Sequence, residues 1–483
     1  MSKKRKNASP LLPQAAPSPS MTRVKLRQAM TLHRQGALTH ARILYEDILR
    51  GAPGHYDALH MLGVIASQCS QHQRAVELIG EAIAIYPDDP VAHANRSVSL
   101  QALGEHESAI AHCDRALTLK PDYVDALYNR ASSQYEINQL NEAIAGLNRV
   151  IELQPHHEKA HWTRSLALLA SGNFEDGWQA HEWRHQVPMH RPYYRHFSQP
   201  AWRGEPLSGK TILLHSEQGL GDTLQFCRYA PLVAQRGARV LLEVDAPLVS
   251  LLEDLQGVDV VAAKGLLTEP FDYQCLLLSL PFAFQTRLDT IPSPRAYLHA
   301  PPEKVTQWSE RLGPRKLPRV GLVWSGSVGH HNDRARSLAL SELLPYLPEG
   351  LEFICLQIEL RERDREALGA APHIRCFHDA ISDFSDTAAL CDLMDVVVSV
   401  DTSVAHLGGA LGKTTWVMLP HFADWRWMLD RPDSPWYPTM TLYRQTARGQ
   451  WHEPLQALKR DLIHLAQQNK DRPPMIDKTE PPE

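Results

Sequence analysis

Two loops in the second half of the sequence carry residue types that could do chemistry. The first, SEQGLGDT at residues 216–223, directly follows the apolar run TILLH. Gly219 and Gly221 permit a tight turn, and Asp222 stands where a helix is predicted to begin. A carboxylate there suits a helix cap or a general base, and it would repel a phosphate. A dinucleotide-binding loop would read G-x-G-x-x-G, so the pattern disfavours that function.

The second loop, DTSVAH at residues 401–406, follows the apolar run DVVVSV and precedes a predicted helix. Backbone N–H groups at a helix start attract anions, and the hydroxyls of Thr402 and Ser403 can donate hydrogen bonds to a diphosphate. His406 lies one turn into that helix, on the side facing the same ligand. Two simpler interpretations stay open: Asp401 as a plain N-cap, and His406 as a hydrogen-bonded core histidine.

Alternating apolar runs and helical stretches predict the elements that position both loops. The runs lie at residues 211–216, 239–244, 258–263 and 275–280, and again at 319–326, 351–357, 395–400 and 414–420. A proline-rich segment, residues 291–304, separates the two series. This alternation predicts two doubly wound parallel α/β halves with a cleft between them. The segment with Trp425, Trp427, Trp436 and Tyr437 could stack on a sugar, but packing between the halves is favoured.

A 34-residue register organises the first third of the chain. It holds alanines at 41, 75, 109 and 143 and prolines at 53, 87, 121 and 155. The small residues let the two helices of a hairpin approach closely, and the prolines end the second helix. The pattern is that of tetratricopeptide (TPR) hairpins, four of them between about residues 22 and 157, with a divergent fifth expected to close the array. Such arrays bind peptides or proteins.

The predicted organisation is therefore α followed by α/β. From the N-terminus, the predicted segments are a disordered tail (1–20), TPR repeats (21–186), a linker (187–208), a first α/β half that binds the acceptor (209–300), a second half that binds the donor (301–470) and a disordered tail (471–483).

Composition excludes several classes of function. The net charge of −5 argues against nucleic acid as a partner, and no run of 18 apolar residues predicts a membrane span. The seven cysteines lack any C-x-x-C pair, which disfavours a zinc site and fits the cytoplasm. No Asp-x-Asp triplet occurs, so we expect neither a metal nor a cofactor.

With both loops in context, the region from Trp202 to about Trp451 resembles bacterial lipopolysaccharide heptosyltransferases. The motifs that carry the resemblance are ILLHSEQGLGDTLQFCRY, VGLVWSG, FSDTAALCDLMDVVVSVDTSVAHLGGALGK and DWRWMLDRPDSPWYP. It is similar to the variant of that superfamily found behind TPR arrays in bacteria, several members of which resemble flagellin-modifying glycosyltransferases. The resemblance implies a GT-B fold of two Rossmann-like halves and an inverting transfer from a nucleotide-diphosphate sugar.

The resemblance also implies roles for individual residues. Asp222 matches the acceptor-side base, and Thr402, Ser403 and His406 match the segment that holds the donor diphosphate. In place of the family's phosphate-binding lysine, Arg334 or Arg336 would have to serve. Ser325 and Gly326 end a strand where backbone could meet the nucleotide, and Gln357 ends another where it could read the base or ribose. The candidate site is completed by Asp401 on the donor side and by Gln218, Gly219 and Gly221 on the acceptor side.

We therefore expect a metal-independent, inverting glycosyltransferase whose acceptor is a protein recruited by the repeats, with a flagellin-like protein as one candidate. Three alternatives remain: a TPR adaptor with an inert transferase-like domain, a transferase acting on a glycan or lipopolysaccharide, and a nucleotide-sugar epimerase. The sequence leaves open the sugar, the nucleotide and the oligomeric state.

Overall fold

The computed structural model describes residues 19–188, 194–330 and 332–470, and it divides into two compact units between Thr163 and Arg164. The first unit consists of helices. They are α1 (Pro19–Arg34), α2 (Leu38–Gly51), α3 (Tyr56–Gln68), α4 (His72–Ile85), α5 (Pro90–Leu103), α6 (His106–Leu119), α7 (Val124–Glu136) and α8 (Leu140–Leu153), followed by α9 (Glu158–Ala170), within which the division falls.

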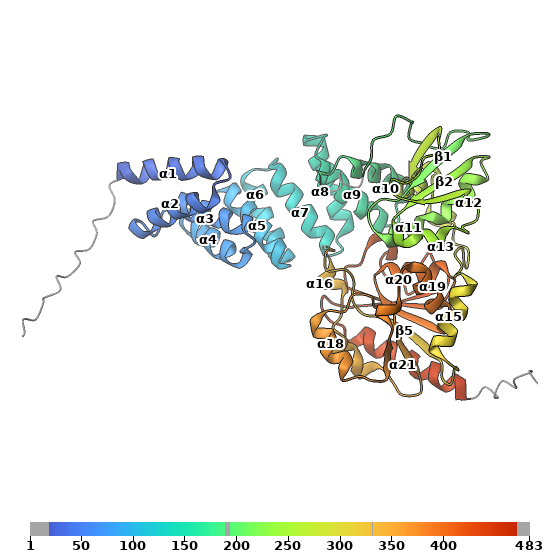
Figure 1. Ribbon diagram of the computed structural model, residues 1–483. Helices are drawn as coiled ribbons and strands as arrows, with labels where there is room; N and C mark the ends of the chain where they lie inside the picture. The colour runs from blue at the N-terminus through green and yellow to red at the C-terminus, as the bar shows by residue number, and fades with distance from the viewer. Residues whose placement is uncertain (1–18, 189–193, 331, 471–483) are drawn as a thin grey trace, which may run out of the picture. The chain divides into compact units, whose positions relative to one another are not determined.

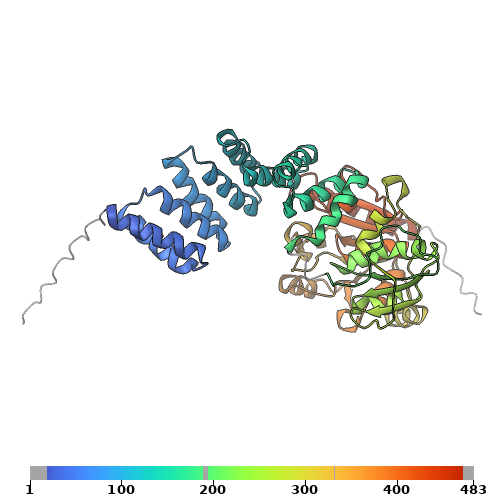
Figure 2. The ribbon, with the colours of Figure 1, turned by 90° about the horizontal axis from the view of Figure 1, so that it is seen from above.

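Each helix from α1 to α7 packs on the next along the chain, as the blue and teal ribbons of Figures 1 and 2 show. The register alanines explain why. Ala41, Ala75, Ala109 and Ala143 are completely buried, so the helices meet at their smallest side chains. Helices α2, α4, α6 and α8 all end two residues before the register prolines. The predicted helical repeat array is confirmed.

The second unit opens with the end of α9, with α10 (Phe174–His181) and with a 3-10 turn, Glu182–His185. Trp178 of α10 explains why this helix belongs to the second unit. Its indole N–H donates to the carbonyl of Thr286 at 3.0 Å, and its ring packs against Phe226, Trp425 and Trp436. Helix α10 is thus part of the core of the α/β region.

The first α/β half is a four-stranded parallel sheet in the order β3-β2-β1-β4. The strands are β1 (Thr211–His215), β2 (Arg239–Val244), β3 (Val260–Ala263) and β4 (Tyr273–Leu276), and the helices are α11 (Leu220–Phe226), α12 (Ala230–Ala234), α13 (Val249–Leu252) and α14 (Leu280–Ala283). Part of the predicted linker extends this sheet, since Ala201 bridges to Gln274 of β4.

The second half is a six-stranded parallel sheet in the order β10-β9-β8-β5-β6-β7. Its strands are β5 (Arg319–Val323), β6 (Glu352–Cys355), β7 (Ile374–Cys376), β8 (Val396–Val400), β9 (Thr415–Leu419) and β10 (Met440–Arg444). Its helices are α15 (Pro302–Leu312), α16 (Asp333–Arg336), α17 (Leu340–Leu343), α18 (Glu362–Gly369), α19 (Phe384–Asp392), α20 (Ser403–Ala410) and α21 (His452–Lys470).

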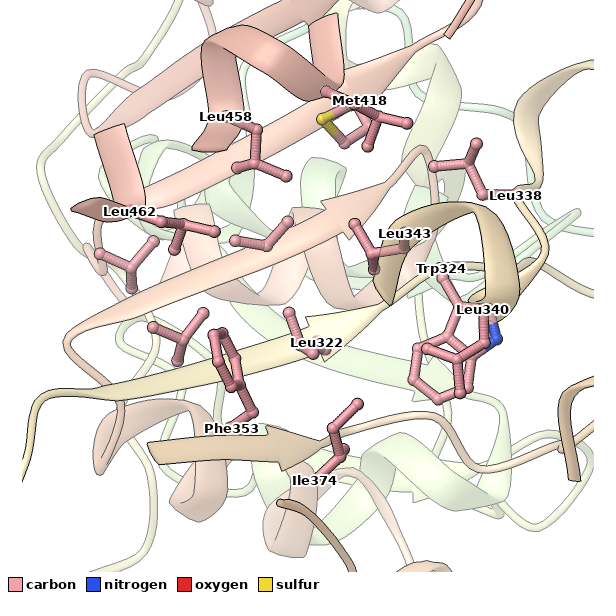
Figure 3. Close-up of a cluster of buried hydrophobic side chains, with 14 of the residues drawn as sticks. Leu322, Trp324, Leu338, Leu340, Leu343, Phe353, Ile374, Met418, Leu458 and Leu462 are labelled. Atoms are coloured by element: carbon pink, nitrogen blue, oxygen red, sulfur yellow. The ribbon is translucent and has the colours of Figure 1, made fainter. Parts of the chain in front are cut away.

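The core of the second half lies against this sheet (Figure 3). Leu322 of β5 and Phe353 of β6 meet Leu343 of α17 and Leu458 of α21, all at most 2 % exposed. Because the central strands are buried on both faces, they are apolar throughout, which is the reason a continuous run such as DVVVSV predicts a strand here. The same packing fixes the carboxyl ends of the strands, from which the candidate site is built.

Candidate active site at the junction of the two sheets

Asp222 lies in the first turn of α11, directly after the loop that follows β1. One carboxylate oxygen, Oδ2, accepts a hydrogen bond of 2.8 Å from the backbone N–H of Gly219, so Asp222 closes its own loop. Gln218 adopts a left-handed backbone conformation with φ of +55°, which is uncommon for a residue other than glycine and makes the loop turn sharply. The predicted helix-cap role of Asp222 is therefore real, and it leaves Oδ1 for other partners.

The partner of Oδ1 is Arg426, which comes from the second half. Its Nη2 donates to Asp222 at 2.5 Å, its Nη1 donates to Asp424 at 2.9 Å, and its Nε donates to Gln225 at 2.6 Å. The guanidinium carbon also lies 4.3 Å from the ring centroid of Trp425. This one side chain connects the loop of the first half to the DWRW segment of the second.

The two influences on the Asp222 carboxyl oppose each other. Burial raises the pKa of Asp222, and the positive charge of Arg426 lowers it, with a net pKa above the usual value for an aspartate. The side chain keeps 17 % of its surface exposed. Asp222 is therefore an oriented, partly accessible carboxylate whose basicity is higher than that of an ordinary surface aspartate.

The second predicted loop forms the start of α20. Thr402 stands at the N-cap position, but its hydroxyl pairs with Ser399 at 2.9 Å and does not cap the helix. Ser403 is half-buried in the first turn. The Thr402 side chain makes no cap hydrogen bond to this helix, and the first N–H groups of a helix have no intrahelical partner, which favours an anion at this end.

Arg336 lies at this helix start and Arg334 does not. Nη1 of Arg336 donates to the backbone carbonyl of Asp401 at 2.7 Å, and its guanidinium lies so close to Gly326 that a Cβ there would come within 2.5 Å of Nη2. Arg334, one half-turn away in α16, is exposed. Of the two predicted candidates, only Arg336 is placed beside Thr402 and Ser403.

Asp401 has a raised pKa. Burial is the main cause, and the negative charge of Asp424 adds to it, so that the pKa of Asp401 is raised to about 6 although Arg336 lowers it. Asp424 itself has a lowered pKa because Arg426 stabilises its charged form. The acid at the start of α20 therefore keeps its proton to a higher pH than an ordinary aspartate, whereas Arg426 favours the ionised form of Asp424.

His406 is a neutral, buried histidine. Desolvation and the charge of Arg426 lower its pKa to about 3. Its Nδ1 is 2.9 Å from the hydroxyl of Tyr437, and its ring stacks on Trp427 with centroids 5.2 Å apart. Any contact of His406 with a diphosphate would thus be a hydrogen bond and not an ion pair.

The two loops meet where we expected a cleft. Helices α11 and α20 pack directly on each other, and a Cβ on Gly221 would lie 2.9 Å from His406 Cδ2 and 3.4 Å from Ser403 Cα. Gly221 is therefore needed for the contact between the two helices. Two cavities of the described residues lie elsewhere: one of about 870 Å³ near Arg315 and Lys413, and one of about 410 Å³ near Phe174.

Ser325 and Gln357 brace each other. The Gln357 side chain accepts from the backbone N–H of Ser325 at 3.2 Å and donates to its carbonyl at 2.8 Å, and it also accepts from Trp324 N–H at 3.3 Å. Both amide atoms are thus engaged by the backbone, which is a structural role, and the expectation that Gln357 reads a base or ribose stays a prediction. Its role is to hold the end of β5, where the hydroxyl of Ser325 is buried without a partner among the described residues.

Several residues that shape the site escaped the sequence analysis. Arg361 donates to the carbonyl of Gly326 at 2.9 Å and to Asp333 at 2.8 Å, which fixes the loop that presents Arg336. Arg184 and Glu217, both completely buried, form a two-point ion pair with distances of 2.7 and 3.0 Å and hold the loop before Asp222. Arg426 could have been found from the sequence, because it is an arginine inside the aromatic DWRW motif.

The favoured interpretation of the aromatic segment as packing is confirmed. Trp425, Trp427, Trp436 and Tyr437 are at most 2 % exposed. Within the described ranges, no cluster of three or more metal-ligating side chains occurs. No described helix has both the length and the apolar character needed to cross a membrane.

Comparisons with known proteins identify the repeats. Family models described as "Tetratricopeptide repeat" match residues 60–124 and 100–172. The chain is 28% identical over 316 residues to Protein FlbA of Caulobacter vibrioides. That match covers 60% of this chain and 52% of FlbA, so the chain spans about half the length of this relative.

Similar solved structures include MamA from Desulfovibrio magneticus RS-1 (16% identity, 34% of this chain, 92% of that chain, TM-score 0.31). Another is YrrB, "a TPR protein with an unusual peptide-binding site" (16% identity, 34% of this chain, 85% of that chain, TM-score 0.31). At these TM-scores neither likeness supports an inference. From the sequence matches and the helices together, the chain carries an N-terminal tetratricopeptide-repeat array, which indicates protein interaction, ahead of a region of parallel sheets and helices.

Proposed function

We propose that the second unit is an inverting glycosyltransferase with a GT-B fold. In this proposal it moves a sugar from a nucleotide-diphosphate donor to a hydroxyl group of an acceptor, without a metal ion, and the repeats bind the protein that carries the acceptor. The single observation behind it is the meeting of two strand–loop–helix openings. One supplies Asp222, and the other supplies the uncapped start of α20 together with Arg336.

Positive charge supports the donor side of the proposal. The guanidinium of Arg336 lies at the start of α20, where its Nη1 donates to the carbonyl of Asp401, and its Nε is buried without a partner among the described residues. A diphosphate would supply the acceptor atoms that these donors lack. As the bond between the anomeric carbon and the diphosphate breaks, negative charge grows on the leaving group, and these same donors stabilise it.

Asp222 supports the acceptor side of the proposal. The acceptor hydroxyl oxygen attacks the anomeric carbon from the face opposite the leaving group, which inverts the configuration. The hydroxyl proton passes to the carboxylate of Asp222, whose pKa is raised by burial and whose orientation is fixed by Gly219 and Arg426. Arg426 is a positioning residue in this scheme.

A second function is favoured by one specific observation. Both carboxylate oxygens of Asp222 already have partners, Gly219 and Arg426, as a purely structural acid would. The chain would then be an adaptor that recruits proteins through its repeats and keeps an inactive transferase-like unit. Transfer of a sugar from any nucleotide donor to any acceptor would eliminate this alternative.

The experiment compares Arg336→Gln with Arg334→Gln in the full chain. Nucleotide sugars and nucleoside diphosphates are screened by thermal shift, where a ligand at 100 times its Kd adds about 2.7 kcal/mol to stability. A hydrogen bond to a charged group contributes roughly 1.5–3 kcal/mol, so Arg336→Gln should weaken binding about 10- to 150-fold. The Arg334→Gln variant changes the same charge two residues away on an exposed side chain and should bind normally.

Equal losses in both variants would contradict the donor site assigned to Arg336. Donor binding with normal affinity but no transfer to protein, peptide or glycan acceptors would favour the adaptor. Turnover of the donor alone, without an acceptor, would instead indicate an epimerase.

A further inference from the structure

Two cysteines outside the proposed catalytic residues are neighbours across two strands. Cys355 ends β6 and Cys376 ends β7, and the two are paired in register in the parallel sheet. Adjacent strands lie about 4.8 Å apart, and residues paired in register point to the same face. Disulfides join Cα atoms that are roughly 4.4–6.8 Å apart, so this pair meets the distance requirement without movement of the backbone.

The two thiols differ in exposure. Cys355 is completely buried, and Cys376, at the edge of the sheet, is half-buried. The neighbouring Cys355 thiol lowers the pKa of Cys376 to about 7, and nearby His378 adds to this effect, while burial and Asp379 oppose it. The pKa of Cys355 is raised by the neighbouring Cys376 and by burial. Cys376 is therefore the nucleophile of the pair, and Cys355 is a protonated thiol beside it.

We propose that Cys355 and Cys376 are a peroxide-responsive thiol pair that forms a reversible disulfide. The Cys376 thiolate attacks hydrogen peroxide, takes one oxygen as a sulfenic acid, and releases hydroxide. The sulfur of Cys355 then attacks the sulfenic sulfur of Cys376. The S–S bond forms, the S–OH bond breaks, and the thiol proton leaves with the hydroxyl group as water. Both sulfur atoms are oxidised and the peroxide is reduced.

The position of the pair gives the reaction a consequence. Sγ of Cys355 lies 3.7 Å from the carbonyl oxygen of Gln357, the residue that braces Ser325 at the end of β5. Disulfide formation removes the S–H group that faces this carbonyl. The oxidation site is thus two residues from the contact that holds one edge of the candidate donor site. The chemistry of the thiol pair itself does not depend on the proposed function.

The test exposes the full-length protein to hydrogen peroxide, blocks remaining thiols and maps peptides by mass spectrometry. We expect a linked pair of peptides containing Cys355 and Cys376 that is lost after dithiothreitol. Cys391→Ala, which removes another buried cysteine, should form the same link. In Cys355→Ala the sulfenic acid of Cys376 has no resolving thiol, so trapping by dimedone should exceed that in the unmodified protein.

A second measurement separates the acidity of Cys376 from its pairing. With a pKa near 7, Cys376 at pH 7 should react with iodoacetamide about threefold faster than a thiol of pKa 8.5, after the lower nucleophilicity of an acidic thiolate is counted. Cys355→Ala should lose this advantage. Cys355→Ser keeps a hydroxyl donor and should retain the rate without forming any disulfide. Absence of the linked peptide in the folded protein, or equal linking among other cysteines, would overturn the proposal.

Discussion

Replacement of Asp222 by Asn should affect the transfer rate of the proposed reaction much more than the stability of the fold, because Arg426 has other hydrogen-bond partners. Removing one partner from a buried ion pair often costs about 3–5 kcal/mol, since the other charge is left uncompensated. Here Arg426 would keep Asp424 at 2.9 Å and Gln225 at 2.6 Å. The arginine is not orphaned, so we expect Asp222→Asn to lower the free energy of unfolding by only about 1 kcal/mol.

If the proposed function holds, the expected effect of Asp222→Asn on the transfer rate is far larger. An Asn of the same shape cannot accept the acceptor's proton, and loss of a general base typically costs about 10²- to 10⁴-fold in rate. Transfer should fall by that factor in kcat, with donor affinity in the thermal-shift assay nearly unchanged. In the unmodified protein, activity should also fall on the acid side at a pH above the usual range of an aspartate, because burial raises the pKa of Asp222 and only its ionised form accepts a proton.

Asp424→Asn is the matched control. It removes a carboxylate from the same arginine, and Asp222 and Gln225 remain to hold the guanidinium. Its stability loss should be similar to that of Asp222→Asn, while its transfer rate should stay within a few-fold of normal. If the two variants lose the same activity, the carboxylates act only by holding Arg426, and the assignment of Asp222 as the base is refuted. A stability loss of 3–5 kcal/mol in Asp222→Asn would refute the argument from shared partners.

Two further predictions concern the junction itself. Gly221→Ala puts a methyl group 2.9 Å from His406, so we expect thermal denaturation to show a loss of about 1–3 kcal/mol in stability. Gly369→Ala is the control, because nothing lies within 4 Å of the added methyl group. Equal stability of the two variants would show that α11 and α20 can shift apart. The pKa of Asp401 in the folded protein, about 6, lies above the ordinary aspartate value of 3.8. Its contribution to stability is therefore present below about pH 4 and is lost as the pH rises through 6. This difference in pKa corresponds to at most about 3 kcal/mol of folding free energy. Asp401→Asn should therefore be more stable than the unmodified protein at about pH 7.5 and should lose that advantage near pH 4. A stability advantage that does not change with pH would contradict the raised pKa of Asp401.

Local patterns predicted the elements well and their contacts poorly. The run RVLLEV is β2 residue for residue, and the register prolines stand just beyond the ends of α4, α6 and α8. Both are periodic signals that depend on a few neighbouring residues. The run at 275–280 is apolar in the same way, yet β4 ends at Leu276 and a 3-10 turn follows. Apolarity alone does not separate a buried strand from a buried turn.

The site shows where such patterns stop. Asp222 and Arg426 are separated by 204 positions, and no spacing rule connects them. Sequence position also could not decide between Arg334 and Arg336, because the choice depends on which side of the short helix α16 faces Asp401. For Gln357, the sequence located the end of a strand but could not show that its amide is held by the backbone of Ser325. Tertiary contact, not residue type, sets each of these functions.

The charges around the junction connect the raised pKa of Asp401 to the proposed donor. Among the described residues, the carboxylates Asp222, Asp401 and Asp424 lie near the arginines Arg336 and Arg426, and Arg228 also acts on the neighbouring neutral His406. If all three acids were ionised, these three positive charges would balance them before any ligand arrives. A diphosphate beside Asp401 would add negative charge, and Coulomb repulsion would raise the proton affinity of the acid further. Because the pKa of Asp401 is already about 6, a proton is available at little cost near neutral pH. On the proposed function, Asp401 thus adjusts the charge of the site, binding a proton when the donor is present and losing it when the nucleotide leaves.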